Sequence, residues 1–120
     1  MRVRALRGAT TTEENTKEDI VSATTELLEE MLDRNDVGTD DVILIIFTST
    51  PELTAEFPAA AVRKLGLSHI PVICARELSV EGALPRTVRA MMLLYTEKAR
   101  EQLRHVYLHE ARQLRTDLPE

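Results

Sequence analysis

Residues 42–47 read Val-Ile-Leu-Ile-Ile-Phe, an uninterrupted run of six apolar residues. The run is rich in β-branched side chains and has no polar residue at alternate positions, so it predicts a β-strand that is buried on both faces. It is far shorter than the ~20 apolar residues that a membrane-spanning helix needs. A chain of 120 residues has room for one core, so we expect residues 1–120 to form a single domain without a membrane span.

Helices and further strands are predicted on both sides of this run. A helix over 16–34 begins with the capping hydroxyl of Thr16 and carries apolar residues at helical spacing. A second helix begins at Phe57-Pro58 and ends before Gly66, because proline suits the first turn and glycine suits the position just past the end. Two short strands are predicted over 3–6 and 70–75.

The last third of the chain supports two interpretations. Residues 87–114 contain the alanine, methionine, leucine, glutamate and glutamine that favour a helix. The apolar residues Val88, Ala90, Met92 and Leu94 also alternate with their neighbours, which would suit a strand. Taken alone, this local pattern favours the helix.

The basic residues are mostly arginine, twelve against three lysines, in a chain whose net charge is −5. The negative net charge disfavours a nucleic-acid binder or a general polyanion binder. Arginine presents a rigid planar fork that binds carboxylates and phosphates through two hydrogen bonds. The ratio therefore indicates either an anion-binding site or a GC-rich genome, and only the positions of the arginines can decide between them.

Sequence motifs for nucleophilic, metal or nucleotide chemistry are absent. The sequence has no phosphate-binding glycine loop and no nucleophile elbow. His105 and His109 are four residues apart, but they lack the HExxH order and a third ligand, so no metal and no other cofactor is expected. Cys74, the only cysteine, excludes an internal disulfide and lies in an apolar segment, where we expect a small buried side chain rather than a reactive thiolate.

Arg89 is the most informative charged residue, because its neighbours over 87–94 are mostly apolar. In such surroundings a guanidinium is costly unless an anion or an acceptor satisfies it. One hypothesis is an anion-binding site of low local dielectric, to which Arg7 and Arg115 could contribute. The alternative is an intramolecular salt bridge, or a side chain that reaches solvent. Glu77, which follows a predicted strand, is in the same way either a surface residue or a site residue.

Distinctive segments occur along almost the whole chain. Arg7-Gly-Ala-Thr-Thr11 near the start is combined with Arg104-His-Val-Tyr-Leu108 near the end. The others are Phe57-Pro-Ala59, Val62-Arg63, Val72-Ile-Cys-Ala-Arg-Glu77, Leu84-Pro-Arg-Thr-Val-Arg89 and Leu114-Arg-Thr-Asp-Leu118. In these segments the chain resembles the small trimeric (AroH) class of chorismate mutase.

The resemblance implies an α+β fold, a mixed β-sheet with helices on its outer side. Three subunits of the family join their sheets into a barrel-like β core, with active sites in clefts between neighbouring subunits. A strand is then expected over 86–95, against the helix that the local pattern favours, and another around 104–109. A homotrimer would also explain a strand that is apolar on both faces, because neighbouring subunits would cover part of that surface.

The family rearranges chorismate, a dicarboxylate, to prephenate on the route to phenylalanine and tyrosine. Within one molecule a C–O bond breaks and a C–C bond forms, with no obligatory proton transfer and no covalent intermediate. An enzyme for this reaction has to hold the compact conformer of chorismate and stabilise the ether oxygen as it gains negative charge. The resemblance therefore implies a cytoplasmic isomerase without a cofactor, whose partners are chorismate and its own neighbouring subunits.

The resemblance also implies a set of site residues. Arg89 would donate to the ether oxygen, and Arg7 and Tyr107 would bind the side-chain carboxylate of chorismate. Glu77 would accept a hydrogen bond from the ring hydroxyl, with Cys74 against the same end of the ring. The remaining implied contacts are the apolar walls Phe57, Ala59, Val72 and Leu114 and, at the mouth of the site, Arg63 and Arg115.

Two positions depart from the family's pattern. Ala60 stands where a lysine is common, which would weaken electrostatic attraction at the mouth. Ile73, an expected substrate contact, stands where a threonine is common, so a polar contact with the ring side is in doubt. The tail over 116–120 is expected to be mobile until a ligand binds.

Two other functions are possible for these residues. A non-catalytic trimeric module could bind an anionic metabolite for regulation, but it would not need a carboxylate such as Glu77 facing its ligand. A small trimeric deaminase or lyase would need a general acid or base.

Overall fold

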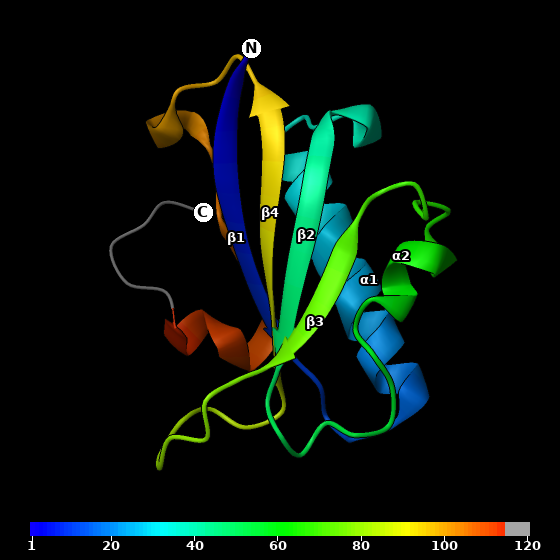
Figure 1. Ribbon diagram of the computed structural model, residues 1–120. Coiled ribbons are helices and arrows are strands. Elements are labelled where there is room, and N and C mark those ends of the chain that lie inside the picture. The colour runs from blue at the N-terminus through cyan, green and yellow to red at the C-terminus, as the bar shows by residue number, and fades with distance from the viewer. Residues whose placement is uncertain (115–120) are drawn as a thin grey trace.

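A five-stranded mixed β-sheet with two α-helices against one face is the architecture of the computed structural model (Figure 1). The structure describes residues 1–114, so Arg115 and the tail over 116–120 lie outside the described residues. The strands are β1 (Arg2–Thr11), β2 (Val42–Ser49), β3 (Val72–Arg76), β4 (Thr87–Thr96) and β5 (Val106–Tyr107). The helices are α1 (Lys17–Arg34), α2 (Ala60–Lys64) and the short 3₁₀ helices η1 (Thr39–Asp41), η2 (Arg100–Gln102) and η3 (His109–Leu114).

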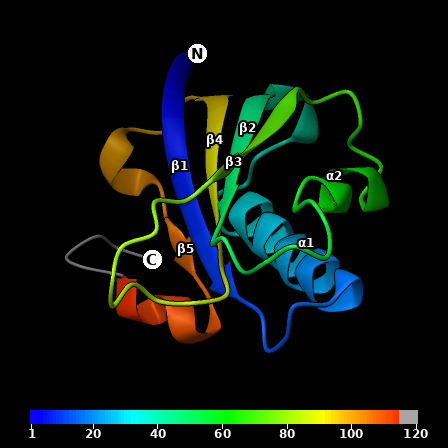
Figure 2. The same ribbon diagram turned by 60° about the horizontal axis from the view of Figure 1, so that its bottom comes forward.

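The strand order is β3-β2-β4-β1-β5, with β4 in the middle. Strand β4 is antiparallel to both β1 and β2, whereas β3 runs parallel to β2 and β5 runs parallel to β1. Both α1 and α2 lie on the same side of this sheet (Figures 1 and 2). The expected α+β class, with a mixed sheet and helices on one side, is confirmed.

Strand β4 corrects the helix that the local pattern favours. Every second side chain of its middle part, Val88, Ala90, Met92 and Leu94, is at most 3% exposed and belongs to the core. This burial has a period of two, and β4 pairs with a neighbour on each side, so non-local packing overrides helix propensity. The strand that the family resemblance implies is therefore confirmed here. The second implied strand is shorter than expected, because only β5 is extended before η3 begins.

Strand β2 is buried on one face only, so the prediction of burial on both faces is wrong for the single chain. Ile45 and Phe47 face α1 and are at most 1% exposed. Leu44 and Ile46 point to the other side and are only half-buried. The reason is that no α-helix within residues 1–114 lies on that side of the sheet. We call this side the open face; along β4 it carries Arg89, Met91, Leu93 and Tyr95.

The ends of the two helices follow local sequence signals. The Thr16 hydroxyl accepts a hydrogen bond from the N–H of Asp19 at 3.1 Å and caps α1, as predicted. Gly66, with φ of +73°, ends α2 as predicted. Its N–H donates to the carbonyl of Arg63, and the N–H of Leu67 donates to that of Val62. Helix α2 itself is shorter than expected, because only turns precede Ala60.

Strand β1 is longer than the predicted 3–6, because Gly8 lies inside the strand rather than at its end. Gly8 faces α1, and a Cβ atom at this position would lie 2.5 Å from Sδ of Met31 and 3.0 Å from a methyl carbon of Leu27. The missing side chain therefore allows α1 to pack closely against β1. No helix within residues 1–114 is both long and apolar enough to cross a membrane.

We expect Gly8→Ala to lower the free energy of unfolding by about 1–3 kcal/mol, because the new methyl group overpacks the α1–β1 contact. Gly38→Ala is the matched control, since its Cβ would only reach a carboxylate oxygen of Asp41 at 3.7 Å. Urea unfolding at one fixed protein concentration measures both variants. Equal stability of Gly8→Ala and the wild type would contradict the close packing described here.

Candidate active site

Three of the expected site residues lie on the open face of the sheet. Arg89 on β4 pairs directly with Ala9 on β1, and Ala9 in turn pairs with Tyr107 on β5. Side chains directly opposite each other on neighbouring strands lie on the same face. Arg7, two residues before Ala9, shares that face because side chains along a strand alternate. The sheet therefore carries Arg7, Arg89 and Tyr107 on one surface.

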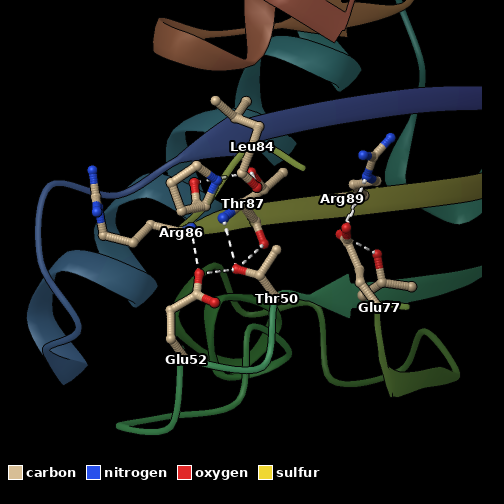
Figure 3. Close-up of polar contacts among 9 residues, drawn as sticks. Thr50, Glu52, Glu77, Leu84, Arg86, Thr87 and Arg89 are labelled. Carbon is tan, nitrogen blue, oxygen red and sulfur yellow. Dashed lines mark hydrogen bonds and ion pairs between the residues drawn. The ribbon is translucent and has the colours of Figure 1, made fainter. Parts of the chain in front are cut away.

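Glu77 is bound to Arg89 across the end of β2. The Nε of Arg89 lies 3.2 Å from each carboxylate oxygen of Glu77 (Figure 3). The Thr48 hydroxyl donates to Oε2 of the same carboxylate at 2.8 Å, and the N–H of Glu77 donates to the carbonyl of Ser49 at 3.0 Å. The side chain of Glu77 is 14% exposed and that of Arg89 is 47% exposed. A largely buried carboxylate thus fixes a cation that remains accessible.

This ion pair is the intramolecular salt bridge that was the alternative to an anion-binding role for Arg89. It uses only the Nε edge of the guanidinium. The two terminal amino groups of Arg89 make no hydrogen bond to any residue of the described chain, 1–114, and they point away from Glu77 in Figure 3. Arginine has five N–H donors, so four of them are left for another acceptor. The salt bridge and an anion-binding role are therefore compatible.

Tyr107 and Leu114 meet at the corner of the open face next to Ala9. Helix η3 folds back over β5, so that Ala9, Tyr107 and Ala111 form a small buried cluster against which Leu114 packs. Tyr107 is 6% exposed. The turn into η3 thus brings two expected site residues, Tyr107 and Leu114, into one cluster.

Arg7 is held beside His105. Its backbone N–H donates to Nδ1 of His105 at 2.9 Å. Burial lowers the pKa of His105 below its ordinary value, and the positive charge of Arg7 lowers it further. The other histidine of the predicted pair, His109, has a different partner, since its Nε2 lies 2.8 Å from Oε1 of Glu26. No group of three or more possible metal ligands occurs among residues 1–114.

The remaining expected residues gather around β3 and α2. Phe57 and Cys74 line a cleft of about 580 Å³ between β3 and the loop that follows β2. Phe57 is 69% exposed. Ala59 and Val72 are half-buried and pack against the hydrophobic core. Arg63 is exposed on α2.

Cys74 pairs with Phe47, which faces α1, so its side chain lies on the side opposite the open face. It is half-buried rather than fully buried as predicted. Burial raises the pKa of the Cys74 thiol, although a hydrogen bond from the backbone of Ala59 acts in the opposite direction. The thiol is therefore uncharged at neutral pH, which agrees with the prediction that it is not a reactive thiolate.

The structure does not bring these two groups of residues together within one chain. Cys74 is on β3 and Tyr107 is on β5, at opposite edges of the sheet. Four strand spacings of about 4.8 Å separate these edges by roughly 19 Å. Unlike Cys74, its neighbour Ile73 on β3 lies on the open face, because it pairs with Ile46. Ile73 is 63% exposed.

Sequence reasoning missed Thr48, whose hydroxyl holds the Glu77 carboxylate. The available signal was a polar residue directly after the apolar run 42–47. A second cleft, of about 820 Å³, was also not predicted. Residues of α1 and η3, of the end of β1 and the segment that follows it, and of the segment before β4 line this cleft, among them Glu26, Arg86 and His109.

The chain is similar to known proteins along nearly its whole length. The model of the family described as chorismate mutase type I matches residues 3–118. Chorismate mutase AroH of Bacillus subtilis (strain 168) is 43% identical over 119 residues, which are 98% of this chain and 94% of that protein. Chorismate mutase AroH of Thermus thermophilus is 46% identical over 117 residues, which are 97% of this chain and 96% of that protein. The solved structure of a chorismate mutase from Clostridium thermocellum superposes with a TM-score of 0.90 and 43% identity, covering 92% of this chain and 98% of the other.

The lowered pKa of His105 predicts a specific pH dependence of stability. Below the ordinary value of 6.5 the unfolded state binds a proton before the folded state does, so the free energy of unfolding falls as the pH falls from 6.5 to the folded-state pKa. His105→Asn places an uncharged acceptor at the position of Nδ1. Its free energy of unfolding should therefore fall less steeply than that of the wild type between about pH 7.5 and about pH 5. Identical slopes in urea unfolding would show that His105 does not contribute.

Proposed function

The chain belongs to the chorismate mutase type I family and carries its isomerase activity, and from this premise we propose how its residues convert chorismate to prephenate. The observation that supports the proposal is the guanidinium of Arg89, which Glu77 binds through Nε while its terminal amino groups stay available on the open face. The ether oxygen of chorismate gains negative charge as the C–O bond stretches. Donors that are fixed beforehand at this atom stabilise the transition state without reorganisation.

Arg89 donates to the ether oxygen in this mechanism, and the other residues hold the substrate. Arg7 and Tyr107, on the same face, bind the side-chain carboxylate and keep chorismate in its compact conformer. Glu77 accepts a hydrogen bond from the ring hydroxyl with the lone pairs that Arg89 and Thr48 do not use. Leu114, which packs beside Tyr107, forms part of the apolar wall. No residue has to gain or lose a proton, which agrees with a reaction that involves no obligatory proton transfer.

The active unit in our proposal is a homotrimer whose open faces join into a barrel-like β core. Large apolar side chains on this face are uncovered in the single chain: Ile73 is 63% exposed, Val3 is 52% exposed and Tyr95 is 45% exposed. Half-buried Leu44 and Ile46 lie between them on β2. An apolar surface of this kind is unfavourable in water and is typical of an interface between subunits.

A trimer also supplies the residues that one chain keeps apart. We propose that Phe57, Ala59, Arg63, Val72 and Cys74 of one subunit complete the site formed by the open face of its neighbour. Ile73 would contact the substrate with a side chain that offers no polar group, and Ala60 adds no charge at the mouth. Arg115 would bind the exposed carboxylate at the mouth of the site.

The compartment we propose is the cytoplasm, and the proposed trimer needs neither a nucleic acid nor a membrane.

The assay for this function follows the ultraviolet absorbance of the enol-ether diene of chorismate. Purified protein should remove this absorbance without any added metal or cofactor, and acid should then convert the product to phenylpyruvate. Tight binding of chorismate without loss of absorbance would instead indicate a binding module.

Arg89→Ala should lower kcat by at least about 10²-fold, because it removes a donor to a developing oxyanion. Arg2→Ala is the control, since Arg2 is also an exposed arginine on the sheet but has no place in the site. Circular dichroism and gel filtration show whether the variants keep the fold and assembly of the wild type. A loss below about tenfold in a folded Arg89→Ala protein would remove Arg89 from the central role.

Mixed subunits test whether the active site is shared. Arg89→Ala disables the open face, and Phe57→Asp puts a negative charge where a dicarboxylate would bind; the exposure of Phe57 lets the fold tolerate this change. Each variant alone should have little activity. After equal amounts are unfolded and refolded together, about one quarter of the sites should combine two intact halves, so about a quarter of wild-type activity should return. No recovery, or full activity of Phe57→Asp alone, would contradict a site between subunits.

A further inference from the structure

Glu52 connects the turn after β2 to Arg86, the residue at which the loop that begins with Glu77 meets the strand that carries Arg89. It lies in the turn after β2, and its Oε2 accepts hydrogen bonds from the Thr50 hydroxyl and from the backbone N–H of Arg86 (Figure 3). Glu52 is an exposed residue whose slight burial acts to raise its pKa, but these two donors and the charge of Arg86 outweigh this effect and hold the pKa below its ordinary value. Glu52 is therefore a carboxylate at neutral pH.

Arg86 has a backbone conformation that needs support. Its φ is +50°, in the left-handed region that residues with a side chain seldom adopt. Its N–H is bound by Glu52, its Nε donates to the carbonyl of Thr12 at 3.1 Å, and its own carbonyl accepts from the N–H of Thr12 at 3.0 Å. Contacts with the turns after β1 and β2 thus hold Arg86 from two sides.

The first residue of β4 is fixed by the same turn. The N–H of Thr87 donates to the Thr50 hydroxyl at 3.0 Å, and the N–H of Thr50 donates to the carbonyl of Thr87 at 3.0 Å. The Thr87 hydroxyl donates to the carbonyl of Leu84 at 3.0 Å. Arg89 follows two residues later on the same strand and pairs with Thr48, so this contact anchors the end of the β2–β4 ladder next to Arg89.

Glu77 begins the loop over 77–86 that ends at Arg86, although its own hydrogen bonds are to Thr48, Ser49 and Arg89. The carboxylate of Glu52 therefore fixes the far end of the loop that presents Glu77 and the near end of the strand that presents Arg89. We propose that Glu52 is a positioning residue for the rearrangement, which acts through the left-handed backbone of Arg86 to align the guanidinium of Arg89 with the ether oxygen. This inference rests on the proposed function.

The expected signature is a fall in kcat with little change in KM. The contact between Arg89 and the ether oxygen strengthens in the transition state, whereas Arg7 and Tyr107 bind the carboxylate in the ground state as well. Glu52→Ala should therefore lower kcat by about tenfold or more, since small misplacements of a catalytic group are costly, and should change KM by less than about threefold. Glu52→Gln, which keeps one acceptor oxygen, should show a smaller loss. Glu81→Ala, in the loop over 77–86, is the control. Glu81 is exposed and makes no hydrogen bond within residues 1–114.

A second substitution separates positioning from general stability. Glycine adopts a positive φ without strain, but Arg86→Gly also removes the Nε contact with Thr12, so Arg86→Gly alone is the reference. In this background Glu52→Ala should lower kcat by less than about threefold, because no strained backbone is left for Glu52 to hold. Thermal unfolding of each variant shows the fraction that is folded at the assay temperature. A full kcat in folded Glu52→Ala, or an equal loss of kcat with and without Arg86→Gly, would overturn the proposal. A wild-type protein that leaves chorismate unchanged in the same assay would instead overturn the function on which it rests.

Discussion

The ion pair between Arg89 and Glu77 determines how the open face can be used. It joins β4 to the loop after β3 across the end of β2, where the Thr48 hydroxyl completes the surroundings of the carboxylate. A guanidinium that used its two terminal amino groups for Glu77 would form a stronger bidentate pair, but it would have no fork left for a ligand. Binding through Nε fixes the plane of the guanidinium and leaves that fork without a hydrogen bond to any residue of 1–114. The burial of Glu77 contributes to this arrangement, because a mobile carboxylate could not hold the guanidinium of Arg89 in one orientation.

Elements whose signals are local were predicted from the sequence, and elements that depend on distant partners were not. The cap at Thr16 and the left-handed Gly66 each need only a few neighbouring residues, and both helix ends follow them. Strand β4 has the composition of a helix and becomes a strand because β1 and β2 pair with it on both sides. Only the resemblance to a family could supply this pairing in advance. The half-buried second face of β2 was missed for a related reason, since no α-helix within residues 1–114 covers it.

The same distinction holds for the candidate site. Arg89 could be selected because an arginine in an apolar segment needs an acceptor, and that argument uses only neighbouring residues. Whether Glu77 was this acceptor could not be decided, because the answer depends on the register that sets Thr48 opposite Arg89. The separation between the open face and the cleft at Phe57 depends on the strand order, in which β3 and β5 are the two edges. Strand order leaves no local pattern in the sequence.

Packing keeps two ionisable groups, Cys74 and His105, uncharged around neutral pH. Burial raises the pKa of Cys74 and lowers that of His105, so that both groups remain uncharged where they would otherwise begin to titrate. The charged side chains of the proposed site are those of Arg7, Arg63, Glu77, Arg89 and Arg115. A reaction that only redistributes electrons within one molecule needs an electrostatic field that is already in place, because no proton arrives to adjust it. Uncharged Cys74 and His105 therefore suit the proposed mechanism, because neither adds a charge that varies with pH near neutrality.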